Sequence, residues 1–357
     1  MLRSASPLDS LARADVPRVI VDLGGLDLAR TGVAVLRVEV RHELGRPSSV
    51  AVDTADLDAE QLEIVDDGRV KEGGPIAVDM GLGDAIAAAF VGEITGLDLE
   101  LSPDEAARAA IRGHDRLHRL ARARKTRAFV EQTDSQIAAT IAQEHGLSAD
   151  ATDSRLVRPY VLQREQTDLA FLLARARGLG YVVRLEDRTL HFRPRGLAGS
   201  PIARATLGVS LLSLQASTSV LGQVGAVEAR GWDPAAQAAV VVEVPESKLA
   251  SRMGGRTSGL KLADACFARE TTAAAAAPHL SADAAELAAA AELEAMALGH
   301  VVCRGRMLGA AALRPGVLLT VDGFRGRFAG DYFLTRVVHT YDRDGFVTEF
   351  EGRRTAT

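Results

Sequence analysis

The chain of 357 residues contains only two cysteines, Cys266 and Cys303. Two cysteines are too few for a disulfide framework or a zinc ribbon, so we expect a reduced, cytoplasmic setting. Aromatic residues make up only 4% of the sequence, and the core must therefore be built mostly from Leu, Val, Ile and Ala. With a net charge of −5, the chain also lacks the basic excess of a dedicated nucleic-acid-binding protein.

Long apolar runs are also missing. No stretch approaches the about 18 uninterrupted apolar residues of a membrane-spanning helix. The N-terminus, MLRSASPLDSLARADVPRVIV, has charges and prolines where a signal peptide needs an apolar run. We therefore expect neither a membrane span nor a signal peptide. Hydrophobic residues at 47% and charged residues at 25% are typical of a soluble globular protein, and the length predicts two or three domains.

Charge is unevenly distributed along the chain. The segment 53–105 is acidic, whereas 108–127 carries eight Arg or Lys residues. These segments are either two solvated faces or a complementary surface between subunits. The basic run has no interleaved aromatic residues, so stacking on single-stranded nucleic acid is unsupported, while contact with phosphate or an acidic partner stays open.

Alternating apolar and polar residues predict short antiparallel strands over the first hundred residues, as in a barrel or sandwich. A mixed α/β unit follows at about 128–200. It contains a capping box from Thr133 to Gln136, a second helix N-capped by Thr167, and a hairpin at Glu186-Asp187. Strands resume after residue 203, an Ala-rich helix is expected from Ser281, and strands end the chain.

An internal repeat links the two strand-rich regions. GGPIAVD at 73–79 parallels GVLLTVD at 316–322, and downstream FVGE at 90–93 parallels FAGD at 328–331. Similar segments in the same order indicate a duplicated β-domain. A further similarity joins ARAAIRGHD, which ends at Asp115, to GAVEARGWD, which ends at Asp233; it places Trp232, expected in the core, where the first segment has His114.

The segment GHDRLH at 113–118 raises the alternative of an enzyme. Two histidines four residues apart on one helix face, with an acidic residue between them, resemble the H-E-x-x-H zinc-protease motif. Gly113 follows a strand-like run, however, and no third ligand is evident. We interpret the segment as a strand exit at a domain boundary, with His114 packed as a ring and His118 at the surface or a hinge. A metal-dependent hydrolase using His114 and His118 is the alternative.

Other catalytic motifs are not found. No nucleophile elbow, phosphate-binding loop or dinucleotide-binding glycine pattern lies between a strand and a helix. We assign no catalytic, cofactor-binding or metal-binding residue, expect no cofactor, and predict that the chain is not an enzyme.

The segment RPYVLQREQTDLAFLLARARGLGYVVRLEDRTLHFRP carries a family resemblance. It resembles the phage late control protein D family, the hub proteins of contractile tails and injection systems, and is similar to the hub part of type VI secretion spikes. The matching residues are Gln163, Asp168-Leu169, Phe171-Leu172, Gly180-Tyr181, Leu190, Phe192 and Pro194. Flanking segments agree, so the resemblance covers nearly the whole chain after residue 15.

The resemblance implies a mainly β fold with α+β insertions. Two tail-tube-like antiparallel β-barrel domains per chain would carry two smaller inserted domains. The implied boundaries are a first barrel at 1–125, a small α/β domain at 126–202, a second, discontinuous barrel at 203–246 and 299–357, and an inserted Ala-rich helical segment at 247–298.

The implied function is structural. Three protomers would form a ring that adapts the hexameric inner tube to a trimeric spike and lines the delivery channel. Expected partners are a homotrimer, the inner tube or tube-initiator protein, a separate spike protein, other baseplate components, and cargo or DNA in the lumen. The chain would assemble in the cytoplasm and then join a virion or injection-system particle, whether of a phage, a tailocin or an extracellular or type VI-like injection system.

Overall fold

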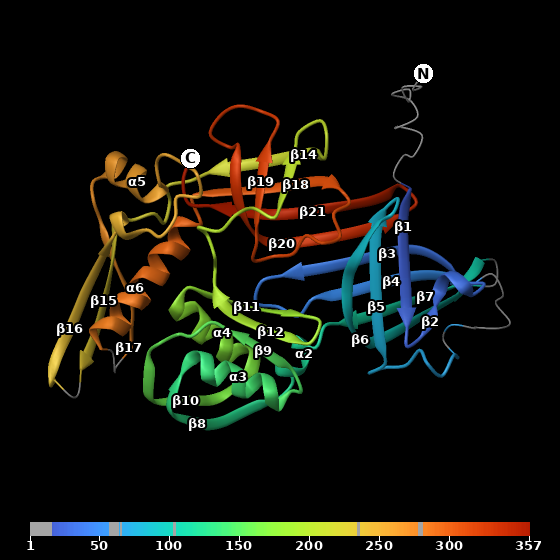
Figure 1. Ribbon diagram of the computed structural model, residues 1–357, viewed down its shortest axis with the longest axis horizontal. Coiled ribbons are helices and arrows are strands. Elements are labelled where there is room, and N and C mark those ends of the chain that lie inside the picture. Colours follow the sequence, from blue (N-terminus) through green and yellow to red (C-terminus); the bar gives the residue numbers. More distant parts are fainter. Residues whose placement is uncertain (1–15, 57–63, 65, 103–104, 234–235, 278–280) are drawn as a thin grey trace, which may run out of the picture.

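The computed structural model describes residues 16–56, 64, 66–102, 105–233, 236–277 and 281–357 (Figure 1). The expectation about a signal peptide concerns residues 1–15, which lie outside this range. Most of the described residues are in strands, and large antiparallel sheets dominate. The prediction of a mainly β fold with α+β insertions is confirmed. None of the described helices is both long enough and apolar enough to cross a membrane.

The N-terminal half-sheet contains seven strands. They are β1 (Pro17–Leu23), β2 (Leu26–Asp27), β3 (Ala34–Glu43), β4 (Ser49–Asp56), β5 (Pro75–Leu82), β6 (Ala85–Ser102) and β7 (Glu105–His114), with the short 3-10 helix η1 (Leu28–Arg30) after β2. Every second side chain of β3, β4 and β7 points inward, and these residues pack with those of β1, β5 and β6 in one core. Figure 1 shows β1 and β5 running across the direction of β3 and β4, so the sheet curls over this core.

The C-terminal half-sheet contains six strands. They are β13 (Ala203–Thr206), β14 (Leu211–Thr218), β18 (Val301–Leu308), β19 (Leu318–Asp322), β20 (Gly330–Asp342) and β21 (Gly345–Arg354). Its core is separate and includes the fully buried Tyr332, whose hydroxyl donates a hydrogen bond to the Phe328 carbonyl at 2.7 Å.

The two half-sheets have the same strand order. The first runs β3-β4-β7-β6-β5-β1, and the second runs β14-β18-β21-β20 and then β19 and β13. The repeated glycines occupy matching positions: Gly73 donates its backbone N–H to Ile94 at 2.7 Å, and Gly316 donates to Leu334 at 2.8 Å. Their φ angles are +82° and +84°, a backbone conformation that glycine adopts at little cost. The duplication predicted from GGPIAVD and GVLLTVD is therefore present, although β1 is antiparallel to β5 while β13 is parallel to β19.

The two half-sheets are joined edge to edge. β20 pairs with β3 in antiparallel register, from Arg336 opposite Glu43 to Tyr341 opposite Val38. This pairing makes one sheet of 13 strands rather than two separate barrels, and in the described part of the chain the sheet closes on itself nowhere. Alternation of side chains along a strand predicts which face is buried, but it does not specify which strand lies at the next edge.

The α/β unit follows β7. It consists of α2 (Leu117–Leu120), β8 (Arg124–Thr133), α3 (Asp134–Glu144), β9 (Ser148–Ala151), β10 (Val157–Thr167), α4 (Asp168–Leu179), β11 (Tyr181–Glu186) and β12 (Thr189–Pro194). The predicted capping box at Thr133 and Gln136 and the N-cap at Thr167 are confirmed. The unit has its own core, which begins with Leu117 of α2. The expected boundary between residues 125 and 126 is wrong, because it cuts through β8.

A second inserted unit lies between β14 and β18. It contains β15 (Ala226–Asp233), β16 (Ala238–Pro245), η2 (Glu246–Lys248), α5 (Gly259–Phe267), β17 (Thr271–Ala277) and α6 (Ala282–Ala297). β15 pairs with β16 and, in parallel, with β17, and α6 packs on this small sheet. The expectation that the second barrel includes 226–245 is therefore wrong, and the Ala-rich segment 247–298 contains a strand as well as helices. The apolar alternation of β15 and β16 could not distinguish the two sheets.

Two of the sequence alignments used for the repeat are also corrected. Strand register places Phe90 opposite Val78 and Gly330 opposite Val321, so FVGE and FAGD are two residues out of alignment. The true counterpart of β7 is β21, because each lies between the matching strands of its half-sheet, whereas β15 belongs to another sheet. Trp232 is 48% exposed and does not lie in a core.

Candidate functional site

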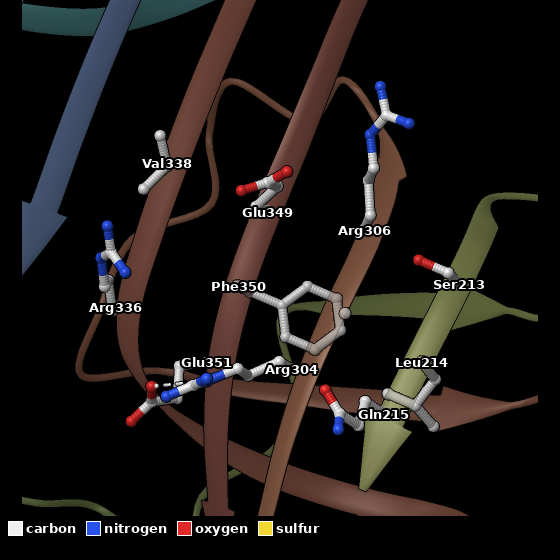
Figure 2. A pocket seen from close by; sticks show the side chains of 11 residues that line it. Ser213, Leu214, Gln215, Arg304, Arg306, Arg336, Val338, Glu349, Phe350 and Glu351 are labelled. Carbon is white, nitrogen blue, oxygen red and sulfur yellow. Dashed lines mark hydrogen bonds and ion pairs between the residues drawn. The ribbon is translucent and has the colours of Figure 1, made fainter.

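The outward face of the 13-stranded sheet, opposite its two cores, carries charged side chains of both half-sheets. Over the C-terminal half-sheet it contains a hollow of about 370 Å³, open to solvent. Figure 2 shows its lining from four neighbouring strands: Ser213, Leu214 and Gln215 of β14, Arg304, Gly305 and Arg306 of β18, Arg336 and Val338 of β20, and Glu349, Phe350 and Glu351 of β21.

Opposite charges face each other across these strands. Register places Arg304 opposite Glu351 and Arg306 opposite Glu349. The Arg304 Nε atom lies 3.4 Å from a Glu351 carboxylate oxygen, an ion pair visible in Figure 2. Cross-strand pairs of opposite charge stabilise an antiparallel sheet by about 0.2–1 kcal/mol each. The hollow therefore carries charges of both signs, with one ion pair, Arg304 with Glu351.

The same face continues over the N-terminal half-sheet. Glu39 of β3 accepts hydrogen bonds from both Arg37 and Arg41. Burial by itself raises the pKa of Glu39, but the hydrogen bonds from the two guanidinium groups outweigh it and hold that pKa below its ordinary value. Further along, Arg112 of β7 pairs with Asp98 of β6 at 2.5 Å. The surface thus presents ion pairs on both half-sheets.

The seam between the half-sheets contains two buried histidines. His42 of β3 and His339 of β20 lie with ring centroids 5.7 Å apart, edge to face. The Nε2 atom of His42 is 3.0 Å from the Ala89 carbonyl, and the Nε2 atom of His339 is 3.1 Å from the Leu313 carbonyl. In both rings Nε2 faces a carbonyl oxygen, which selects the neutral tautomer with its proton on Nε2.

A guanidinium group also reaches this seam. Arg314 Nη1 lies 3.3 Å from Nε2 of His339, and its Nη2 donates to the Ala88 carbonyl. Burial, with the Arg314 charge as a further cause, lowers the pKa of His339 to about 3, and burial likewise lowers the pKa of His42 well below its ordinary value. Both rings are therefore neutral at physiological pH.

The residues that carry the family resemblance form a polar network inside the α/β unit. Gln163 is fully buried and donates to Asp168 at 2.9 Å. Asp168, only 1% exposed, also accepts hydrogen bonds or ion pairs from Lys125 at 2.7 Å, Arg127 at 3.0 Å and His145 at 2.8 Å. Burial alone raises the pKa of Asp168, but its hydrogen bonds hold it below the ordinary value. Every oxygen of this carboxylate is occupied by the fold, so the network connects β8, β10, α3 and α4.

The two histidines of GHDRLH lie on different elements. His114 ends β7, and its Nδ1 lies 2.9 Å from the Thr95 hydroxyl, whereas His118 belongs to α2 and its Nδ1 lies 2.8 Å from the Asp115 carbonyl. The geometry of an H-E-x-x-H helix is therefore not formed. Half-buried His114 does not correspond to Trp232, because β7 and β15 belong to different sheets. Within the described ranges, no three His, Cys, Asp or Glu side chains are grouped as a metal site requires.

The acidic segment 53–105 and the basic segment 108–127 contact each other within one chain, next to His118. Glu93, only 5% exposed, accepts hydrogen bonds from Arg116 at 3.0 Å and from Arg119 at 2.9 Å. Burial raises its pKa, but the two arginines outweigh that effect and lower it. The contact attaches the start of the α/β unit to β6. Sequence reasoning considered a solvated face or a subunit interface and missed this contact within one chain.

Sequence reasoning also missed the seam. His42 and His339 belong to strands far apart in the sequence, and neither forms a motif with its neighbours.

The equivalence of the two half-sheets has a further, weaker signal in the sequence. Thr95 and Thr335 each lie between a large aliphatic residue and Gly or Arg. Their hydroxyls donate to the backbone of Arg112 at 3.4 Å and of Glu351 at 3.3 Å, which are matching positions in the two half-sheets.

Solved structures with a similar fold include two tail proteins and a type VI secretion component. The 43 kDa tail protein of prophage MuSo2 from Shewanella oneidensis has a TM-score of 0.69 and 13% identity, covering 95% of this chain and 98% of its own. A tail protein from Neisseria meningitidis has a TM-score of 0.67 and 14% identity, with 95% and 97% covered. An E. coli protein described as a type VI secretion component similar to phage T4 tail proteins has a TM-score of 0.62 and 17% identity, with 94% and 77% covered. The chain thus has a tail-protein fold.

The family follows from the sequence. Residues 13–342 match the family model described as the Alg8 N-terminal domain, and the chain belongs to that family. No curated protein matches the sequence.

Proposed function

We propose that the chain is a structural hub of a phage tail or phage-tail-like injection system. Three copies form a ring that adapts a hexameric inner tube to a trimeric spike, and the broad charged face is the surface available to line the delivery channel. The observation that supports this best is the duplication. Because each chain carries two half-sheets of the same strand order, three chains present six similar units to a six-fold tube.

The proposed role is mechanical and requires no catalytic residue. The polar clusters support this, because their groups are engaged with one another: Asp168 with its cations, Glu93 with its two arginines, and the seam histidines with backbone carbonyls. The proposed partners are further copies of the chain, a tube or tube-initiator protein, a separate spike protein, other baseplate components, and cargo or DNA in the channel. Assembly in the cytoplasm would precede incorporation into a particle.

Native mass spectrometry and negative-stain electron microscopy of the purified full chain test the proposal. We expect a species of three times the chain mass and ring-shaped particles with six-fold-like features around a central channel. A chain that stays monomeric at the highest attainable concentration, or that forms closed dimers with two-fold symmetry, would contradict the hub. The fold itself would not be in question, because the tail-protein fold does not depend on the oligomer.

A further inference from the structure

One face of the two-stranded ribbon formed by β8 and β10 has no covering layer. These strands pair with each other and with no other strand of the described chain. Their odd-numbered positions point into the α/β unit, where Phe129 and Val161 join the core and Phe129 stacks on Phe171 of α4, with ring centroids 5.7 Å apart. Figure 1 shows both strands at the lower margin of the molecule. Because side chains alternate along a strand, the even-numbered positions form the opposite, uncovered face.

The centre of this face is apolar. The face, called the ribbon face below, consists of Arg124, Thr126, Ala128 and Val130 of β8 and Tyr160, Leu162 and Arg164 of β10. Tyr160 lies directly opposite Val130, and Leu162 lies directly opposite Ala128. The exposed fractions are 61% for Tyr160, 59% for Val130 and 45% for Leu162. Side chains in such adjacent cross-strand positions contact each other, so they form one continuous exposed patch. A contiguous apolar patch of this kind is typical of an interaction site.

Two arginines extend the patch at one end. Arg124 and Arg164 are exposed, and neither forms an ion pair with a described residue, although Arg124 donates one hydrogen bond to a backbone carbonyl. The inward-facing cations of the same strand differ, because Lys125 and Arg127 are both paired with Asp168. No Asp or Glu occupies a position of the ribbon face. The face is therefore apolar at its centre and carries unbalanced positive charge at one end.

The size of the ribbon face matches one α-helix. The face is about 20 Å long from Arg124 to Val130, at about 3.3 Å per residue, and about 10 Å wide across two strands. An α-helix is about 10–12 Å across, and about 13 residues of it span 20 Å. Such an area is far below the roughly 800 Å² per partner of a standard globular interface, so it fits a single segment. Helices are also the usual cover of a sheet face in mixed α/β structures, as α3 and α4 are on the other side.

The described helices of this chain do not supply such a segment. α3 and α4 pack their apolar sides in the core of the α/β unit, and α6 does so in the second inserted unit. α5 spans nine residues, short of the length of the face, and Asp264 is its single carboxylate residue. The helix that would cover the ribbon face therefore belongs to another protein.

We propose that the ribbon face binds an amphipathic α-helix of a partner protein, with apolar side chains over Val130, Tyr160 and Leu162 and carboxylates over Arg124 and Arg164. Removal of the apolar patch from water favours the contact. The two arginines fix the direction of the helix, since a guanidinium group pairs with a carboxylate in a defined geometry. Tyr and Arg are also the residue types that contribute most to binding at many interfaces. The inference goes beyond the proposed hub and does not depend on the number of its copies, because the face lies on one chain.

Fluorescence anisotropy with a labelled peptide tests the proposal on the purified full chain. The probe is a helix of about 14 residues, stapled on its polar face, with leucines at i, i+3, i+4 and i+7 and glutamates at one end. The matched peptide has lysines in place of the glutamates. We expect the glutamate peptide to bind about tenfold more tightly, because attraction to two arginines replaces repulsion, and its binding should weaken as salt is added.

Three variants locate the binding on the ribbon face. Arg164→Glu should reverse the preference, so that the lysine peptide binds more tightly than the glutamate peptide. Tyr160→Ser should weaken the binding of both peptides about tenfold, because the exposed ring supplies a large apolar contact. Both residues are exposed, so the thermal unfolding of each variant should match that of the native chain. Arg343→Glu, in the exposed turn between β20 and β21, is the matched control and should bind the glutamate peptide like the native chain.

The opposite outcomes are equally clear. No binding of either peptide, equal binding of both, or an unchanged affinity of the Tyr160→Ser variant would overturn the proposal. Loss of self-association on Tyr160→Ser, measured by sedimentation, would assign the ribbon face to a second copy of the chain. Binding of the native chain to phosphatidylglycerol vesicles, abolished by the same substitution, would assign the face to a membrane surface. Either of these results would also overturn the proposed helix. A chain that stays monomeric and binds the glutamate peptide as expected would support the ribbon face and contradict the hub.

Discussion

The buried histidines at the seam, His42 and His339, should make the stability of the folded chain depend on pH. His339 is fully buried, its Nδ1 lies 3.0 Å from the Thr348 hydroxyl, and that hydroxyl in turn accepts the Ala310 N–H at 2.9 Å. The Thr348 proton is thus free to be donated to Nδ1 of the neutral ring. Protonation of the ring would place a second positive charge beside Arg314, and no carboxylate among the described residues is in contact with the ring.

The size of the effect follows from linkage between proton binding and unfolding. Folding lowers the pKa of His339 to about 3, whereas the unfolded chain titrates near about 6.5. Between these values the unfolded state binds the proton and the folded state does not, so stability is complete above about pH 6.5 and falls as the pH decreases toward 3. At pH 5 this one ring should cost about 2 kcal/mol of the free energy of unfolding, and His42 acts in the same direction.

One carboxyl group opposes this trend. Burial raises the pKa of Asp115 to about 6, so its protonation below that pH favours the folded state. The native chain alone therefore cannot isolate the histidine. His339→Gln is the matched variant, since its amide nitrogen can still donate to the Leu313 carbonyl and does not titrate in this range.

Hydrogen exchange of the paired β3 and β20 backbone amides is the suitable assay, because the single tryptophan lies in β15, on another sheet. Exchange is measured for the native chain and the His339→Gln variant at pH 7.5 and at pH 5. We expect the native opening free energy to fall by about 2 kcal/mol more than that of the variant. A difference between the two chains that stays the same at both pH values would refute the assignment of a neutral, pKa-depressed His339.

Three further predictions concern stability. Asp168→Asn should lower the free energy of unfolding of the α/β unit by about 1–3 kcal/mol in denaturant titrations, because the charge that Lys125 and Arg127 contact is lost and one acceptor oxygen becomes an NH2 donor; an unchanged midpoint would contradict a structural role. Gly305→Ala should lower the free energy of unfolding by about 1–3 kcal/mol and lower the melting temperature, because the added Cβ would lie 2.3 Å from the Phe350 ring. A variant that melts like the native chain would contradict this packing. Gly73→Ala and Gly316→Ala should each lower the free energy of unfolding by about 1 kcal/mol, since both positions have a positive φ. Clearly unequal losses of this free energy in calorimetry would argue against the equivalence of the two glycines.

Features that depend on neighbours in the sequence could be predicted. Thr133 and Gln136 satisfy each other's backbone within one helical turn, and Thr167 caps the next helix in the same way. Gly73 and Gly316 were identified as the first residues of the repeated segments GGPIAVD and GVLLTVD, and both have a positive φ. Such signals are local, and the structure confirms them.

Features that depend on pairing between distant strands could not be predicted. β7 and β15 read alike, yet β7 pairs with β4 and β6 while β15 pairs with β16 and β17. The same apolar alternation suits either sheet, because it records burial and not the identity of the neighbour. The seam histidines were missed for the same reason, since their chemistry arises only when β3 and β20 lie side by side.

The position of the second inserted unit has a consequence for how such chains can change. β14 ends at Thr218 and β18 begins at Val301, and these two residues are directly paired across the sheet. The segment between them therefore leaves and re-enters the sheet at one point, where a two-residue turn would also connect the strands. It contacts the α/β unit through the ion pairs of Arg195 with Glu294 at 2.9 Å and of Arg177 with Glu292 at 3.6 Å, and Leu287 of α6 packs against the core of that unit. A segment can therefore be inserted at this point while the strands on both sides keep their register, which makes the connection between β14 and β18 a natural point for evolutionary insertion and for the attachment of engineered domains.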